Sequence, residues 1–96
     1  MKTLIFHVGM QDAQGVRWPL KFVVCQLRYR KVDCTIQLGE GIWQGQSEPT
    51  AIITVVVDDA LVTTTTSKVM KLAHLMNQES ILVREVQEDS YFVQVE

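Results

Sequence analysis

Trp43 is the residue of this chain that most invites a search for a binding site. It lies in the stretch GEGIWQGQSEPT, where three glycines surround it just ahead of a strongly apolar run. An indole in a two-stranded arm packs either on the core of its own domain or against a ligand or partner, because it joins a large apolar surface to one N–H donor. The sequence leaves both interpretations of Trp43 open.

The glycines of this stretch, Gly39, Gly41 and Gly45, spell GxGxxxG and resemble a phosphate-binding loop at first sight. A dinucleotide-binding fingerprint needs a different spacing and a helix that starts directly after it, whereas a strand is expected here. The chain also lacks the lysine of a P-loop motif. We therefore expect these glycines to shape a bulged and twisted hairpin.

A positively charged strip is expected between residues 16 and 32, which include five of the nine basic residues and no acidic one. On a helix, four of these cations share one stripe: Arg17, Lys21, Arg28 and Lys31. Such a strip on an acidic protein can meet a phosphate-bearing ligand or an acidic protein surface. The alternative is an ordinary solvated helix face, whose charges contribute little.

His7 is the histidine with a foreseeable role. The alternation around it predicts a strand that points its side chain to the open face of a sheet, where it would have a structural role, hydrogen-bond a ligand or lie at a contact between subunits. His74 lies far from it in sequence, and Cys25 and Cys34 lack metal-type spacing. We therefore expect neither a metal site nor a cofactor.

Length and composition indicate one domain that spans residues 1–96. Such a chain buries a single core but is too short to enclose an active site between two lobes, so we expect a protein that is not an enzyme. A net charge of −2 and a pI near 5.6 argue against a nucleic-acid partner or an anionic membrane. Two cysteines without metal spacing, and a start without signal-peptide features, predict a cytoplasmic protein.

Alternating apolar residues predict strands over residues 3–10, 34–38 with an extension to Trp43, 51–57, 80–86 and 91–96. The run AIITVVV at 51–57 is apolar on both faces, which is typical of a central strand covered on two sides. Residues 87–90 are expected to form a turn before the last strand.

Two helices are expected between these strands. The Thr63–Ser67 cluster offers N-caps for a helix whose inward stripe holds four apolar residues: Val69, Leu72, Ala73 and Met76. Residues 19–31 fit a helix, although the alternation within 22–31 also fits a strand, and we favour the helix. Its core-facing stripe would hold Trp18, Phe22, Cys25 and Tyr29. A second apolar stripe, which meets the other helix or forms an interface, would hold Leu20, Val23 and Leu27.

The order strand, helix, strand, strand, helix, strand predicts an α+β fold of the ferredoxin-like βαββαβ type, with an antiparallel sheet and an added C-terminal strand. Both helices then cover one face of the sheet. The other face carries Ile5 and His7, together with Ile52, Thr54 and Val56 or the residues that alternate with them. A face this apolar favours association, so we expect a homo-oligomer, most simply a dimer.

Two longer stretches, GIWQGQSEPTAIITV and KLAHLMNQESILV, resemble a group of small uncharacterised α+β proteins found on phages and other mobile elements. The shared features are a first strand with a glycine turn, a GxW-type hairpin with Glu48 nearby, and a late helix that ends in an NQES-like step. The resemblance implies a cytoplasmic, phage-encoded protein that binds or blocks a bacterial component. It implies no catalytic activity.

Three functions are compatible with these features. The preferred one is a non-catalytic binding module that acts on a host (defence) component through the 39–48 hairpin, with Trp43 and Glu48, and through the basic strip. The second is a sponge that sequesters a phosphate-bearing nucleotide signal between subunits, with Arg and Lys on the phosphates and Trp43 or Tyr29 for stacking. The third is a small hydrolase or isomerase, which requires a carboxylate or thiol within hydrogen-bond reach of His7.

Overall fold

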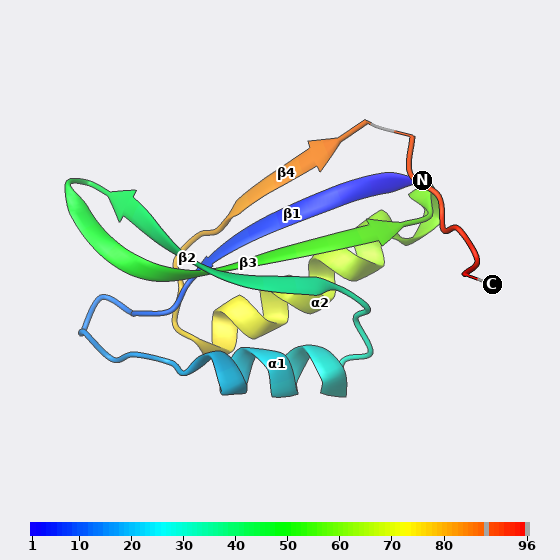
Figure 1. The fold of residues 1–96 in the computed structure, drawn as a ribbon. Helices are drawn as coiled ribbons and strands as arrows, with labels where there is room; N and C mark the ends of the chain where they lie inside the picture. The colour runs from blue at the N-terminus through cyan, green and yellow to red at the C-terminus, as the bar shows by residue number, and fades with distance from the viewer. Residues whose placement is uncertain (88, 96) are drawn as a thin grey trace.

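The computed structural model describes residues 1–87 and 89–95 of the chain. Its elements follow the expected order of strands and helices (Figure 1). They are β1 (Lys2–Gly9), α1 (Leu20–Tyr29), β2 (Thr35–Trp43), β3 (Gln46–Val57), the short 3₁₀ helix η1 (Asp59–Leu61), α2 (Val62–Leu75) and β4 (Leu82–Val86).

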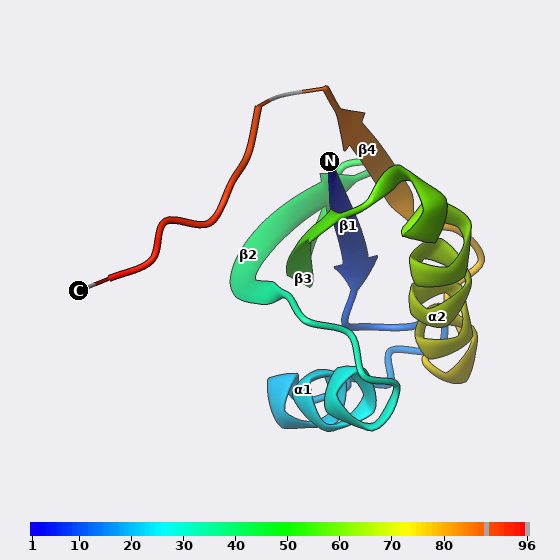
Figure 2. The ribbon, with the colours of Figure 1, turned by 90° about the vertical axis from the view of Figure 1, so that its right-hand side faces the viewer.

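The four strands form one antiparallel sheet in the order β2-β3-β1-β4. Both helices lie on the same side of this sheet, and the other side is left without helical cover (Figures 1 and 2). The α+β class, with two helices on a four-stranded antiparallel sheet, is therefore confirmed. Within the described part of the chain, neither helix is long and apolar enough to cross a bilayer.

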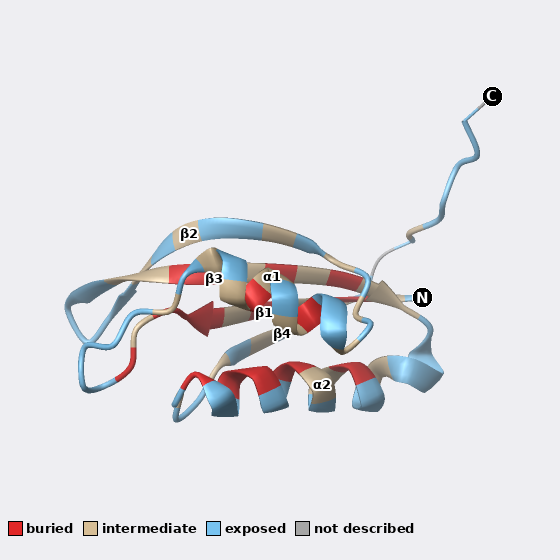
Figure 3. Cartoon of the chain, turned by 90° about the horizontal axis from the view of Figure 1, so that it is seen from below, coloured by how far each residue is buried: buried red, intermediate tan, exposed pale blue. Residues whose placement is uncertain are grey.

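The core fills the space between the sheet and the helices. Every second residue of β1 and β3 points into it, as the pleat of a strand requires. The buried side chains from the strands are Leu4, Phe6, Val8, Ala51, Ile53 and Val55, and those from the helices are Val23, Leu27, Val69, Leu72 and Ala73, with Met76 just after α2. Figure 3 colours these segments red, whereas β2 and β4 show no buried residue. The inward stripe expected for α2 is confirmed.

The helix over residues 20–29 is confirmed, but the stripe expected to face the core is correct only in part: Trp18 and Phe22 pack against the core, and its other two residues do not. Val23 and Leu27 are buried, whereas Cys25 is exposed and Tyr29 is 79% exposed. The backbone N–H of Trp18 donates to the Met10 carbonyl at 2.8 Å, which ties the chain to the end of β1 just before the helix begins. Both stripes of α1 are apolar, so helical periodicity alone does not decide which stripe faces the core. The attachment of the Trp18 backbone to Met10 accompanies the observed rotation of the helix.

The second helix also begins differently from the expectation. We predicted N-caps within Thr63–Ser67, but α2 begins at Val62 and these residues lie inside it. The chain enters α2 through η1, whose Leu61 N–H donates to the Asp58 carbonyl at 2.8 Å. The preceding 3₁₀ turn therefore starts the helix without a side-chain cap.

The strands β2 and β3 form a long hairpin around the turn Gln44-Gly45. Both turn residues have positive φ, 51° and 78°, as a two-residue type I′ turn requires. The pairing then runs without interruption from Trp43↔Gln46 to Thr35↔Thr54. The hairpin is thus confirmed, but the expected bulge is wrong.

The strand β3 is central, as predicted, because it pairs with β2 on one side and β1 on the other. The predicted cover on both of its faces is wrong for the single chain. Ile52, Thr54 and Val56 lie on the face away from the helices and are only half-buried. Ile5 and His7 share that face and are half-buried too, so the apolar open face expected from the alternation is present.

The added C-terminal strand is wrong for residues 91–95, which form no strand and project away from the domain (Figure 2). Glu96, the last residue of that expected strand, lies outside the described residues. The turn predicted over residues 87–90 includes Glu88, which also lies outside them.

Candidate functional site

A cavity of about 560 Å³ lies where the end of β1 meets the β2–β3 hairpin and the connection from α2 to β4. It opens on the sheet face that the helices leave uncovered. His7 and Gly9 reach it from β1, and Trp43, Glu48 and Thr50 reach it from the hairpin. The α2–β4 connection supplies the opposite wall: Asn77, Gln78, Glu79, Ser80 and Ile81.

The hairpin places Trp43 and Glu48 on one face because of its register. Gly41 pairs with Glu48 and Trp43 pairs with Gln46, so these positions share the side on which His7 pairs with Ile52. The structure therefore brings together three residues that the sequence singled out: His7, Trp43 and Glu48. The Trp43 side chain is 68% exposed, so the interpretation of this residue as part of the core is wrong.

Two glycines make room for the polar side chains of the cavity. A Cβ at Gly9 would lie 2.7 Å from Glu48 Oε1 and 2.8 Å from Gln78 Oε1. A Cβ at Gly41 would lie 2.7 Å from Thr50 Oγ1. Glycine at positions 9 and 41 thus lets these groups lie directly against the backbone.

Hydrogen bonds hold the two loops that border the cavity. The Gln78 side-chain amide donates to the Gln11 carbonyl at 3.1 Å, which ties the α2–β4 connection to the end of β1. The Asp12 carboxylate accepts from the backbone N–H groups of Gln14 and Val16, each at 2.9 Å. These local bonds fix the loop after β1, since an Asp side chain can replace a backbone acceptor in a tight turn.

His7 leaves a polar atom unsatisfied at this site. Its Nε2 atom is buried and has no hydrogen-bond partner among the described residues. An unpaired buried polar atom costs about 1–3 kcal/mol, and a ligand that hydrogen-bonds it offsets this cost. The hydrolase or isomerase hypothesis required a carboxylate or thiol within hydrogen-bond reach of His7, and no such group among the described residues bonds its Nε2 atom.

The charge of the cavity is acidic. Asp12, Glu48 and Glu79 line it, and no lysine or arginine does so among the described residues. Within the same residues, the Glu48 carboxylate makes no hydrogen bond or ion pair. This lining attracts a cation and repels a phosphate.

The basic strip lies elsewhere. All four of its residues are exposed on or beside α1, and none lines the cavity: Arg17, Lys21, Arg28 and Lys31. Arg17 donates from Nε to Gln11 Oε1 at 3.2 Å. The role of the strip in binding stays a prediction.

Sequence reasoning missed the contribution of Asp12 and of the α2–β4 connection. The NQES step at residues 77–80 is visible in the sequence, but nothing local indicates that it faces the hairpin. Only the antiparallel pairing of β4 with β1, Leu82 opposite His7, brings it there.

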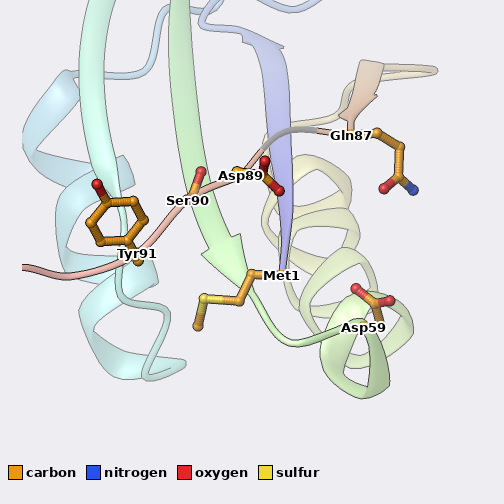
Figure 4. A pocket seen from close by; sticks show the side chains of 6 residues that line it. All are labelled: Met1, Asp59, Gln87, Asp89, Ser90 and Tyr91. Atoms are coloured by element: carbon orange, nitrogen blue, oxygen red, sulfur yellow. The ribbon is translucent and has the colours of Figure 1, made fainter.

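A second cavity of about 560 Å³ lies where the C-terminal segment passes the start of β1 (Figure 4). Its lining is Met1, Asp59, Gln87, Asp89, Ser90 and Tyr91. Tyr91 is 81% exposed, so this hollow belongs to a projecting segment and offers no enclosed place for a reacting group.

Thiol chemistry finds no support either. Burial, together with the negative charge of Asp33, raises the pKa of the Cys34 thiol, so the thiol is kept in its protonated and poorly nucleophilic form. Among residues 1–87 and 89–95, no group of three or more His, Cys, Asp or Glu side chains could hold a metal ion.

Comparison with solved structures shows that the fold occurs in an enzyme and in a designed protein. A phage SAM lyase in its apo state matches with a TM-score of 0.70 over 95% of this chain and 92% of its own, at 15% identity. The de novo designed protein Foldit4 matches with a TM-score of 0.59 over 92% of this chain and 98% of its own, at 11% identity. No protein-family model and no curated protein sequence matches the chain. Identities this low show a shared fold and assign no activity.

The likeness corrects the prediction that the protein is not an enzyme. That prediction rested on the idea that a domain of about this size cannot hold an active site. A lyase of the same fold, matched over 95% of this chain and 92% of its own, contradicts it.

Proposed function

We propose that this chain is an enzyme that binds S-adenosylmethionine (SAM) in the cavity lined by His7, Trp43 and Glu48 and cleaves it as a lyase. The observation that carries the proposal is the acidic lining of that cavity beside an accessible indole. SAM carries a sulfonium and an ammonium group against a single carboxylate, and it also presents a flat adenine ring. The lyase of the same fold supports this choice of ligand.

Each of the three residues has a role that its surroundings support. The Trp43 ring offers a face for the adenine or for the sulfonium cation, which aromatic rings attract. The Glu48 carboxylate accepts hydrogen bonds from the ammonium group, because no residue described here already occupies it. The unpaired Nε2 of His7 bonds a polar group of the ligand.

A sulfonium lyase cleaves its substrate without an oxidant or a second substrate. The carbon–sulfur bond breaks, its electron pair stays on sulfur, and the sulfur leaves as a neutral thioether. The carbon fragment gives one proton to a base, and the electron pair of the broken carbon–hydrogen bond forms a carbon–carbon double bond. Glu48 and His7 are two of the basic groups that line the cavity, and carboxylates and imidazoles are common general bases in enzymes.

The same lining gives no support to a nucleotide sponge. Three carboxylates would repel each phosphate group, and the cations expected to hold phosphate lie at α1 instead.

We further assign the chain to the ferredoxin-like arrangement, which its element order and its strand order β2-β3-β1-β4 support. A phage origin and a cytoplasmic location follow as proposals from the resemblance noted in the sequence and from the phage lyase of the same fold. A phage protein with this activity would act on its host by removing SAM, a host metabolite. This removal would be the action on a host component that was expected from the sequence.

The test is incubation of the full chain with SAM, followed by mass spectrometry of the mixture. We expect loss of SAM and the appearance of a thioether, with Glu48→Gln at least tenfold slower. Glu40→Gln is the matched control, because Glu40 lies on the same hairpin but pairs with Pro49 and lies outside the cavity lining. No turnover and no calorimetric binding of SAM would refute the proposal, and binding of ATP or a cyclic dinucleotide in its place would restore the sponge.

A further inference from the structure

The C-terminal segment of the described chain, residues 91–95, is exposed although most of its residues are apolar. Tyr91, Phe92 and Val93 are followed by Gln94 and Val95, and all five are exposed. Phe92 is 84% exposed and Val95 is 93% exposed, although side chains of this kind are mostly buried in folded proteins. Their alternation still has the form of a strand, with Tyr91, Val93 and Val95 on one side.

The outer edge of β2 is a strand edge without the usual protection. It is nine residues long, its pairing with β3 is regular, and Glu40 is its only charged residue. Natural edge strands are protected by lysines, prolines, bulges or short length, and β2 has none of these. It also exposes Leu38 and Ile42 on its helix side. The other edge, β4, is short and carries Arg84 and Glu85.

We propose that residues 91–95 of one chain pair as an added strand with the free edge of β2 in a second copy of this chain. The backbone groups of the β2 edge supply hydrogen bonds, as in other cases of strand addition. Tyr91, Val93 and Val95 then cover Leu38 and Ile42 of the other copy. This proposal names the contact through which the predicted homo-oligomer forms. It does not rest on the proposed lyase activity, although Ile42 also lines the cavity proposed to bind SAM.

The placement of residues 91–95 favours pairing with β2 of a second copy over pairing with β2 of the same chain. The segment follows β4, and the strand order puts β3 and β1 between β4 and β2. After the end of β4 the segment passes Met1 and leaves the domain (Figures 2 and 4). Its apolar residues thus stand away from their own sheet.

The area involved fits a stable interface. Each buried aromatic side chain removes roughly 150–250 Å² from water, so Tyr91 on the helix side of the extended sheet and Phe92 on its opposite side together remove roughly 300–500 Å². The receiving surface loses a similar area, so two exchanged segments bury roughly 1,200–2,000 Å², which is the range of specific protein interfaces.

The first test compares the full chain with a chain that ends at Ser90, by size-exclusion chromatography with light scattering over a range of concentrations. We expect the full chain to have a multiple of its 10.9 kDa mass and the shortened chain to be monomeric. Equal association states of the two chains would overturn the proposal, as would a full chain that stays monomeric because the segment pairs with its own β2.

Point variants test the strand pairing itself. Val93→Pro removes a backbone N–H donor and is expected to abolish association, whereas Val93→Ile, the matched control, keeps it. Leu38→Lys places a charge on the receiving edge at an exposed position, where folding is expected to be unaffected. A labelled peptide of residues 87–96 is expected to bind the shortened chain and to bind its Leu38→Lys variant at least tenfold more weakly. Equal binding to both would overturn the proposal.

Discussion

The substitution Gly9→Ala tests whether the position of the Glu48 carboxylate decides the activity. The added Cβ would lie 2.7 Å from Glu48 Oε1 and 2.8 Å from Gln78 Oε1, whereas ordinary contact begins at 3.4 Å. Both atoms belong to the ends of flexible side chains, so they move by about 0.7 Å and the fold is kept. A misplacement of about 1 Å can cost an enzyme on the order of 100-fold in rate.

We therefore expect Gly9→Ala to lower kcat/KM for SAM cleavage by at least about tenfold, which corresponds to about 1.4 kcal/mol. Its free energy of unfolding is expected to change by less than about 1 kcal/mol, because alanine restricts the unfolded chain and this gain offsets the local crowding. The assays are steady-state kinetics by mass spectrometry and urea denaturation.

Gly39→Ala is the matched control for this experiment. Its added Cβ would lie 2.9 Å from Ile52 Cδ1, so it crowds the same sheet face equally but lies outside the cavity lining. Activities of Gly9→Ala and Gly39→Ala within twofold of each other would refute the reasoning, since the carboxylate position would then have no effect.

Three further predictions concern stability and thiol reactivity. Trp43→Ala is expected to change the free energy of unfolding by less than about 1 kcal/mol in urea titrations, because the side chain is exposed, whereas a buried indole costs about 3–5 kcal/mol. Asp12→Ala is expected to lower the melting temperature by leaving the N–H groups of Gln14 and Val16 unpaired, at a cost of about 1–3 kcal/mol, while Asp12→Asn recovers most of it. Alkylation of Cys34 is expected to require a higher pH in the folded chain than in urea, because folding raises its pKa; equal pH profiles would contradict this. By linkage, the contribution of Cys34 to stability is complete below the unfolded pKa and is lost as the pH rises through the folded pKa.

Local patterns alone determined much of this architecture. The alternation in β1 predicted both the strand and the residues that point into the core, because the side-chain period of a strand is two. The run at residues 51–57 predicted a strand but left open which of its faces points into the core. The spacing of Val69, Leu72 and Ala73 predicted the buried side of α2 for the same kind of reason. The patterns of β1 and α2 are strong because each of these two elements has one clearly more apolar face.

The rotation of α1 and the state of the C-terminal segment needed the tertiary structure. Both stripes of α1 are apolar, so only the attachment of Trp18 to the end of β1 and the packing against the sheet distinguish them. Residues 91–95 have a strand pattern, but a strand forms only where it pairs with a neighbouring edge, and in the single chain these residues pair with none.

The candidate site was also predicted only in part from the sequence. The sequence singled out His7, Trp43 and Glu48 separately, and the alternation around His7 already placed it on the open face. Their meeting in one cavity, the acidic charge of that cavity and the exclusion of the basic strip from it depend on strand order and register, which join segments far apart in the chain. Residue type and periodicity are local properties and so can be read along the sequence, whereas the electrostatic environment of a site is a sum over neighbours that only the folded chain brings together.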